Sequence, residues 1–463
     1  MAKRQRKPTA RRTDVPRESH ESQRIVDRSA RRVFILGAGS DVACGVPTVG
    51  DLLPQLAAFV RGEGAELNAA LRKKLPYLRF TFDQFAAGKA EAMVADLFSD
   101  ANGRGPTWRG VATKLKSDAE MEPLGEVIDH LCSMAENNQL SGATLKALVR
   151  LAGDGTDVGE AEPIIDPTKI ALSQLPAAGL RAAFQQALAK TQTYTPTERE
   201  LLEQFILSVS NIEELLSTYF TLFMLARASS EQKTYLYLAW ILWAFLWLKS
   251  EGRSAPERSI YSRLPSLGGS VITFNYTNFF GRTTGRGPLF FHGRLDRFLR
   301  VDDRRVVAGI PSLRGAPSSD RVVSFFNELR LDVNIAPQLD IPVIVPPLGF
   351  KPLMSRVQLR TWAEADDLLQ NADQIVIVGY SFAVADEHFN DLLRQTPGTT
   401  RIVVVNPDLD VTLRRAGAVL GVDPAILTSR DCGGVEVLAA RRLTGLKALA
   451  EEVDGELLDA ALR

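Results

Sequence analysis

The sequence predicts an α/β fold, in which a parallel sheet carries a large all-α insertion. The first observation is a set of short segments that are apolar throughout, as parallel strands covered by helices on both faces are. The second is that glycine or polar residues follow these segments directly, where open α/β sheets bind ligands. The third is a long interval of helical spacing, roughly Leu52 to Leu267, after the first such segment.

The first predicted strand begins at Val33 and runs into a glycine-containing loop, an arrangement that is Rossmann-like. Glycines at 37 and 39 allow a positive φ, a close approach to a pyrophosphate and N–H groups directed at its oxygens. Valine stands at position 42, where a full dinucleotide fingerprint has a third glycine, so a plain tight turn is the alternative. The residues that we expect to bind the phosphates, with Asp41 as a ribose or water contact, are Gly37, Ala38, Gly39 and Ser40.

The interval after this loop predicts an all-α subdomain. Helical spacing occurs in Pro123 to Glu136, Leu180 to Thr191, Thr197 to Leu225 and Glu231 to Ser250, whereas Gly153 to Asp166 is typical of a loop. Tyr235 to Leu248 is too short for a ~30 Å hydrocarbon core, so we expect a buried helix and no membrane span. Its tryptophans at 240, 243 and 247 form an aromatic stripe, for which a helix–helix contact or a subunit contact is the alternative.

Four later segments complete the predicted sheet and its binding edge. The segment Val271 to Asn278 places Asn275 at the end of a predicted strand, and the segment Leu289 to Gly293 places His292 beside a glycine. Gln374 to Phe382 ends in a second Gly-x-Ser turn, and Arg401 to Asp408 ends in an asparagine. We expect these residues to meet at the carboxyl edge of the sheet.

These motifs, in this order, resemble the sirtuin-like family, specifically the bacterial branch of sirtuin-like NAD hydrolases used in antiphage defence. The resemblance covers about the first thirty residues after Arg32 and most of the region from Ser270 to Asp408. The matching motifs are Gly37-Ala38-Gly39-Ser40 with Gly45-Val46-Pro47, Thr273-Phe274-Asn275-Tyr276, His292-Gly293, Gly379-Tyr380-Ser381, and Asn406.

The resemblance implies cleavage of the nicotinamide–ribose bond of NAD, without a metal, to give nicotinamide and ADP-ribose. Asn275 would hold the ribose and orient a water, and His292 would accept a proton from a ribose hydroxyl or from that water. The resemblance further implies that the second loop, which contains Gly379 and Ser381, faces the phosphates and the ribose of NAD. It also implies that Asn406 and Asp408 border the adenosine. The NAD-binding set beyond the first loop is Thr273, Tyr276, Gly379, Ser381, Asn406 and Asp408.

The chain also departs from the family pattern. Thr277 stands where the family has an aspartate that is expected to hold the nicotinamide amide, and Thr48-Val49-Gly50 stands where sirtuin deacylases have Asp-Phe-Arg. The four thiolates of the sirtuin zinc module are missing, since the three cysteines stand alone. Thr277 therefore leaves a non-catalytic NAD- or ADP-ribose-binding subunit of a defence complex as an alternative to the hydrolase. A protein deacylase, the third alternative, would need the zinc module that the sequence lacks.

Individual residues also have structural interpretations. His292 after two phenylalanines is typical of a half-buried imidazole, and Asn275 is a candidate helix N-cap. His388 is expected on an exposed helix, because it and the acids before it do not share a helical face as metal ligands would. Ser381 lacks the second glycine of a nucleophile elbow. A run of arginines follows His292 and Gly293. It indicates either a solvated loop or a basic patch that contacts the NAD phosphates, a nucleic acid or an acidic subunit surface. The arginines are Arg294, Arg297, Arg300, Arg304 and Arg305.

Composition favours a cytoplasmic protein. The 463 residues hold 55 basic and 55 acidic side chains, so no net charge draws the chain to nucleic acid or membrane. Three unpaired cysteines and no signal peptide indicate a reducing compartment. The resemblance implies homo-oligomers and, as partners, a HerA-type motor ATPase or other defence subunit. Any motor would be a separate subunit, since the sequence has no Walker A motif.

The predicted domains follow from these patterns. Residues 1–32 form a disordered tail with eleven basic and four acidic residues, for which solvation and a nucleic-acid contact both stay open. Residues 33–60 and 268–430 form the NAD-binding domain, and residues 61–267 the helical insertion. Residues 431–463 form a C-terminal extension of strand and helix.

Overall fold

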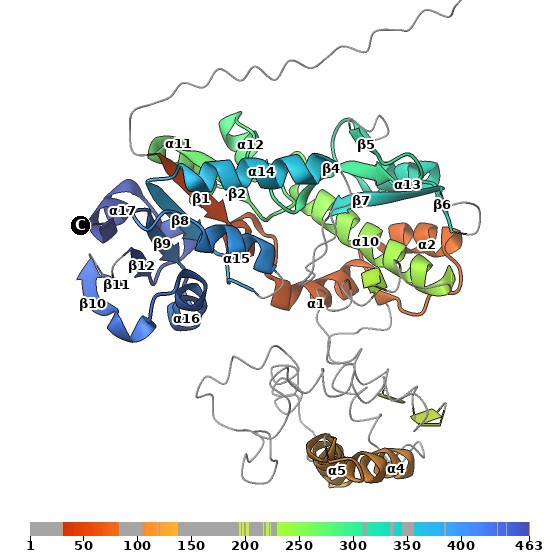
Figure 1. The fold of residues 1–463 in the computed structure, drawn as a ribbon. Coiled ribbons are helices and arrows are strands. Elements are labelled where there is room, and N and C mark those ends of the chain that lie inside the picture. The colour runs from red at the N-terminus through yellow and green to blue at the C-terminus, as the bar shows by residue number, and fades with distance from the viewer. Residues whose placement is uncertain are drawn as a thin grey trace, which may run out of the picture.

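The structure is a computed structural model that describes residues 31–82, 105–119, 121–137, 194–195, 197–198, 201–202, 216, 219–221, 223, 229–308, 313–333, 338–344, 356–383, 386–432, 434–440 and 442–462. These residues form two sheets with helices around them (Figure 1). The larger sheet has the strand order β10-β11-β12-β9-β8-β1-β2-β3. Its strands are β1 (Arg32–Leu36), β2 (Ser270–Thr273), β3 (Leu289–Phe290), β8 (Gln374–Val378), β9 (Arg401–Val405), β10 (Thr428–Cys432), β11 (Val435–Ala440) and β12 (Leu443–Leu446).

Six neighbouring strands of the larger sheet, from β3 to β12, are parallel, and β11 and β10 extend it antiparallel at one edge. The expected parallel strands are therefore confirmed. Two of them are shorter than their apolar runs, because β2 ends at Thr273 and β3 at Phe290. The chain turns directly after β2, where the Thr273 hydroxyl accepts a hydrogen bond from the Asn275 N–H at 3.1 Å.

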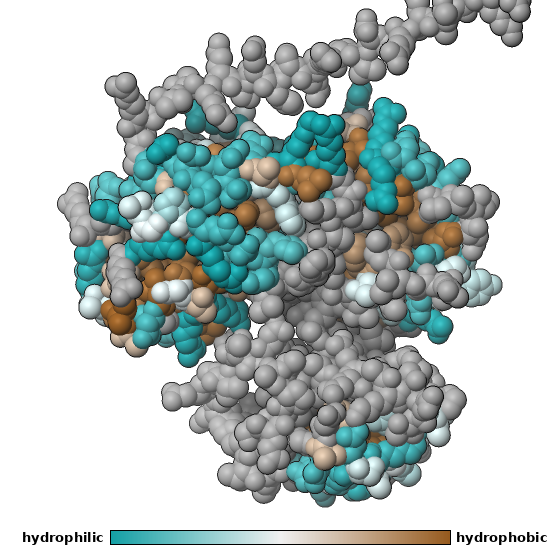
Figure 2. All heavy atoms as spheres, in the orientation of Figure 1, coloured by the Kyte–Doolittle hydropathy of each residue, from teal (hydrophilic) through white to brown (hydrophobic). Residues whose placement is uncertain are grey.

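Helices cover both faces of the parallel part of this sheet, which explains why strands such as β1, β8 and β9 are apolar without alternation. Val33 and Ile35 of β1 pack in one core with α14 (Arg356–Gln370), α15 (Glu387–Arg394) and α16 (Leu409–Leu420). Phe34 and Leu36 pack in the opposite core with α1 (Val49–Phe59), α11 (Ile260–Leu267) and α17 (Gly455–Leu462). Figure 2 shows that the described surface over α14 is mostly hydrophilic, as expected for an outer layer.

A smaller antiparallel sheet with the order β5-β4-β7-β6 lies beside the first. Its strands are β4 (Gly293–Arg300), β5 (Arg305–Ala308), β6 (Leu331–Asp332) and β7 (Gln338–Ile344). The interpretation of the arginine-rich run as a solvated loop is thus wrong. Arg294, Arg297 and Arg300 lie on β4, whose intervening Leu295, Phe298 and Leu299 are buried in the core.

The helix α10 (Ser229–Ser250) forms the core beneath the smaller sheet, between it and α2 (Ala65–Lys74) (Figure 1). Its tryptophans are buried as predicted, and Trp240 packs edge-on against Phe298 of β4 and Phe325 of α13 (Ser319–Glu328). The Trp240 Nε1–H donates to the Asp340 carbonyl at 3.0 Å. Among the described helices, none is both long and apolar enough to cross a membrane.

The described residues between β1 and β2 form helices, including α4 (Gly105–Lys116) and α5 (Glu122–Glu136), and α5 confirms the helix predicted at Pro123 to Glu136. The all-α character of the whole insertion stays a prediction. Its segments Gly153 to Asp166 and Leu180 to Thr191 and most of Thr197 to Leu225 lie outside the described residues, as does the predicted tail up to residue 30. The remaining elements are η1 (Ala38–Cys44), α12 (Phe279–Thr284), η7 (Pro424–Ile426) and η8 (Ala450–Glu452).

Candidate functional site

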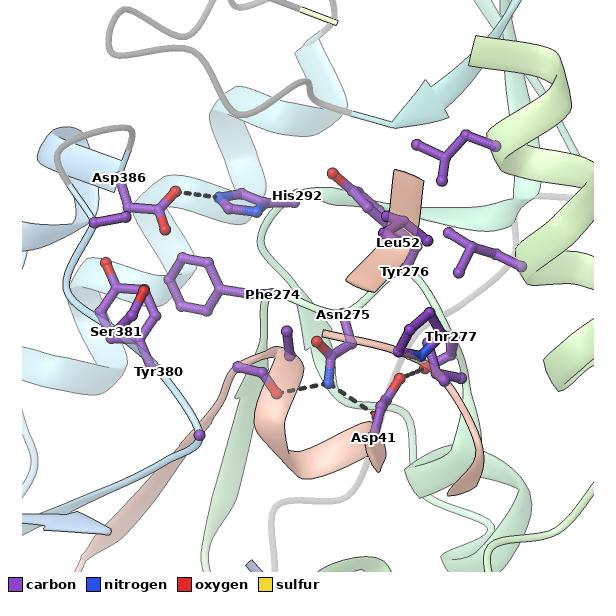
Figure 3. A pocket seen from close by; sticks show the side chains of 18 of the residues that line it. Asp41, Leu52, Phe274, Asn275, Tyr276, Thr277, His292, Tyr380, Ser381 and Asp386 are labelled. Atoms are coloured by element: carbon purple, nitrogen blue, oxygen red, sulfur yellow. Dashed lines mark hydrogen bonds and ion pairs between the residues drawn. The ribbon is translucent and has the colours of Figure 1, made fainter. Parts of the chain in front are cut away.

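A pocket of about 210 Å³ lies at the carboxyl edge of the larger sheet, where β1, β2, β3 and β8 end (Figure 3). One wall is polar and comes from the segments after these strands: it includes Asp41, Asn275, His292, Ser381 and Asp386. The opposite wall is apolar and includes α1 and α10; its residues are Val46, Pro47, Leu52, Leu216, Leu242 and Leu246. The pocket therefore presents hydrogen-bonding groups to one side of a ligand and hydrocarbon to the other.

The glycines of the first loop have a packing role that the sequence did not predict. Neither Gly37 nor Gly39 has a positive φ, so that expectation is wrong. A Cβ on Gly37 would lie 2.4 Å from the Gly379 carbonyl oxygen, and a Cβ on Gly39 would lie 2.8 Å from the Gly379 Cα. The N–H groups of Gly37 and Gly39 donate to the Val378 and Gly379 carbonyls at 2.9 and 3.1 Å. The glycines thus let the loops after β1 and β8 pack backbone against backbone, and the positive φ, +65°, belongs to Gly379.

The Asn275 side chain is fixed by its amide nitrogen. Nδ2 lies 3.0 Å from the Gly37 carbonyl oxygen and 2.9 Å from Oδ1 of Asp41, and it also lies 3.0 Å from the Ser40 hydroxyl. A backbone carbonyl and a carboxylate only accept hydrogen bonds, so the nitrogen faces them and the side-chain oxygen is turned away, as Figure 3 shows. Asn275 is not the N-cap of α12, which begins after Asn278.

Asp41 is buried in the floor of the pocket, with 2% of its surface exposed. Its carboxylate accepts hydrogen bonds from the hydroxyls of Thr277 and Tyr261 and from Asn275. Burial raises the pKa of Asp41 to about 6, and these three hydrogen bonds oppose the rise. The nearby thiol of Cys44 has its pKa raised to about 12 by burial and by the Asp41 charge, so it stays protonated.

His292 occupies the junction between the two sheets, because β3 ends two residues before it and β4 begins one residue after it. It is 7% exposed, and its ring meets Phe274 edge-to-face with centroids 4.6 Å apart. Nε2 lies 3.2 Å from Oδ1 of Asp386, in the segment before α15. The structure thus brings Asn275 and His292 to one pocket, as predicted from strand ends.

The other predicted residues fall into three groups. Ala38, Tyr276, Gly379 and Ser381 line the pocket, whereas Ser40 and Thr273 lie buried beneath it. Asn406 and Asp408 are not among its lining residues; the Asn406 side chain accepts the Asp408 N–H at 2.9 Å, directly before α16. His388 lies on α15 with its ring 5.4 Å from that of Trp362, and the described residues contain no group of three side chains placed to hold a metal.

Sequence reasoning missed three side chains that complete the site. Tyr261 comes from α11 and Asp386 from the segment before α15, and no local motif marks either one. Thr277 was noticed only for the aspartate that it replaces, yet its hydroxyl bonds a carboxylate supplied by Asp41. Only the folded chain places these groups together.

Comparison with known proteins gives a limited likeness. No protein-family model matches the chain, and no curated protein matches it. Among solved structures, a Sir2 homolog–NAD complex is 16% identical with a TM-score of 0.34, over 54% of this chain and 77% of that one. A Sir2 enzyme structure concerned with mechanism and regulation is 16% identical with a TM-score of 0.29, over 48% of this chain and 73% of that one. Likeness at this level assigns neither a substrate nor a reaction to this chain.

Proposed function

We propose that the chain is an NAD hydrolase that cleaves the bond between nicotinamide and ribose, giving nicotinamide and ADP-ribose. The observation that carries the proposal is the convergence of Asn275 and His292 on one pocket at the glycine-loop edge of the sheet. These are the two residues to which the order of motifs in the sequence assigns the chemistry. Because Asn275 follows β2 and His292 follows β3, their convergence depends on how the chain folds.

The polar wall suits a reaction through an oxocarbenium-like ribose. Nicotinamide leaves with the electron pair of the C–N bond and departs neutral, so the protein has mainly to position the reactants and manage charge. The Asn275 side-chain oxygen, turned away from Asp41, accepts a hydrogen bond from the attacking water or a ribose hydroxyl. His292 takes the proton that the water loses as its oxygen bonds to the anomeric carbon.

The apolar wall suits the leaving group. Leu52 of α1 and Leu242 and Leu246 of α10 form a surface without hydrogen-bonding groups opposite the polar side chains. A flat aromatic ring that loses its positive charge during the reaction is stabilised by contact with such a surface. Nicotinamide would therefore lie against α10, and the ribose would lie over Asn275.

The test is nicotinamide release from NAD by the purified chain and by Asn275→Ala and His292→Ala. We expect each substitution to lower kcat at least about 100-fold, since each removes a group that acts in the transition state. His388→Ala is the matched control, because that imidazole lies on α15 and does not line the pocket. Release that persists in both pocket variants would refute the assignment.

A second candidate is a non-catalytic NAD- or ADP-ribose-binding subunit. The observation that favours it is Thr277, whose hydroxyl is bonded to Asp41 and which stands where the family pattern has an aspartate. NAD that binds tightly to the wild-type chain and is recovered intact, with or without partner proteins, would support this candidate. Acyl-ADP-ribose as a product would instead indicate a deacylase.

We further propose that the hydrolase acts in antiphage defence, in the cytoplasm, as a homo-oligomer gated by a partner such as a HerA-type motor. Unregulated hydrolysis of NAD would kill the cell that makes the enzyme, so its activity needs a gate. Cellular NAD measured during phage infection, with wild-type chain and with Asn275→Ala, tests the role. An equal NAD level in the two strains would contradict it.

A further inference from the structure

His292 and Asp386 form a contact that the motif pattern does not assign. The imidazole Nε2 lies 3.2 Å from the carboxylate Oδ1, and the two side chains are 9% and 12% exposed. Both line the pocket, and in Figure 3 the carboxylate stands at the end of the imidazole that points away from Tyr276. When the imidazole is protonated the contact becomes an ion pair, and one this sheltered is weakly screened by solvent.

Asp386 is itself held in place by its surroundings. Tyr380 lies beside it. Burial raises the pKa of Tyr380 well above its ordinary value, and the charges of Asp386 and Glu387 and a hydrogen bond with Asp386 raise it further. The Tyr380 hydroxyl has a single proton to donate, and the Asn390 side-chain oxygen, 2.9 Å away, is a second acceptor for it beside Asp386; Asn390 in turn donates to the Ala383 carbonyl at 3.2 Å. These bonds tie the segment that carries Asp386 to α15.

The imidazole is equally constrained on its faces. Phe274 stacks on Tyr380 with centroids 4.7 Å apart and meets the His292 ring at 90°. Phe291 stacks on Trp362 of α14 with an interplanar angle of 4°. The ring of His292 thus has a fixed plane, and its Nε2 has a fixed carboxylate partner.

We propose that Asp386 is the positioning residue of His292, holding the proton on Nε2 so that Nδ1 is the nitrogen that accepts the proton in NAD hydrolysis. The inference rests on the proposed function and names a further residue of that site. A carboxylate that accepts from one imidazole nitrogen fixes the tautomer and stabilises the imidazolium. The water proton passes to Nδ1 as the oxygen bonds to the anomeric carbon, and the imidazolium later releases it to solvent.

The pH dependence follows from the groups around the imidazole. The titratable side chains that line the pocket with it are Asp41, Tyr276, Tyr380 and Asp386; Glu387 and His388 begin α15, and Arg294 and Asp296 follow on β4. Asp386 is the charged group that lies within ion-pair distance of the imidazole, 3.2 Å from Nε2. Removing its charge therefore destabilises the imidazolium, and the midpoint of the rise of kcat with pH moves to lower pH.

The experiment compares wild type, Asp386→Asn and Asp386→Glu in nicotinamide release from pH 5 to 9. We expect Asp386→Asn to lose at least about tenfold in plateau kcat, with KM changed less than about threefold, and its midpoint to fall by about one pH unit or more. Asp386→Glu restores the wild-type midpoint. The matched control is Glu387→Gln. It removes the neighbouring carboxylate, which pairs with Arg394 and not with His292. A midpoint in Asp386→Asn equal to that of wild type would overturn the inference.

A second measurement does not need activity. The chain has four histidines, so the imidazole of His292 can be assigned by His292→Gln in ¹⁵N-histidine-labelled protein and titrated by NMR. We expect the Nε2–H tautomer in wild type and a fall of about one unit or more in the imidazole pKa in Asp386→Asn. The Nδ1–H tautomer in wild type, or an unchanged pKa, refutes the pairing. A wild-type chain that releases no nicotinamide, either alone or with its partner proteins, refutes the proposed function separately.

Discussion

Gly379→Ala tests the packing of the two loops on which the pocket depends. Gly379 has a φ of +65°, which costs an alanine about 1–2 kcal/mol. The added Cβ would also lie 2.7 Å from the Gly39 Cα and from the Ser40 nitrogen. Both are backbone atoms of the 3₁₀ helix η1, so they cannot rotate away, and overpacking of this kind costs about 1–3 kcal/mol. We expect a total loss of about 2–5 kcal/mol in the free energy of unfolding.

The chain supplies a matched control for this prediction. Gly421, the C-cap of α16, also has a φ of +65°, but a Cβ there would meet no atom within 4 Å. Gly421→Ala therefore carries the backbone cost alone, and the difference between the two variants measures the contact between the loops. Urea unfolding followed by circular dichroism gives both values. Equal destabilisation by the two substitutions would refute the argument that Gly379 is required by close approach.

Two further predictions concern buried groups. Because burial raises the pKa of Asp41 from 3.8 to about 6, the folded chain keeps a proton that the unfolded chain has released between these pH values. The free energy of unfolding thus falls by about 3 kcal/mol as the pH rises through that window. Asp41→Asn lacks this contribution, and parallel pH dependences of the two proteins in urea unfolding would contradict the assignment. Trp240→Phe removes the donor to the Asp340 carbonyl and costs about 1–3 kcal/mol, measured by the same method. Trp362→Phe, whose indole is only half-buried and donates at 3.4 Å, should cost less, and an equal or larger loss there would contradict the prediction.

The parallel strands and the convergence of Asn275 and His292 were predictable because local patterns encode both. The strand Arg401–Val405 is apolar at every position after its first, which burial on both faces explains. A polar residue placed directly after such a strand must lie at the carboxyl edge of the sheet. Both patterns can be recognised within a few residues, without knowledge of the rest of the chain.

Features that depend on contacts between distant segments were not predictable. Asp386 and Tyr261 become part of the site only through the packing of α15 and α11, and nothing in their neighbours distinguishes them from surface residues. β4 was missed for another reason. Its arginines suggested a loop, but their stems lie on a sheet whose opposite face is buried against Trp240. The roles of Gly37 and Gly39 needed the position of Gly379.

The placement of β1 between β2 and β8 has a consequence for synthesis of the chain. The hydrogen bond from Asn275 to Gly37 joins residues 238 positions apart, and closing a loop of that length costs about 5 kcal/mol of chain entropy. The second loop and Asp386 are translated later still. A ribosome-bound chain therefore carries the glycine loop without a pocket until β8 and Asp386 have been translated. The newborn protein gains the capacity to bind a ligand only when these later segments have emerged.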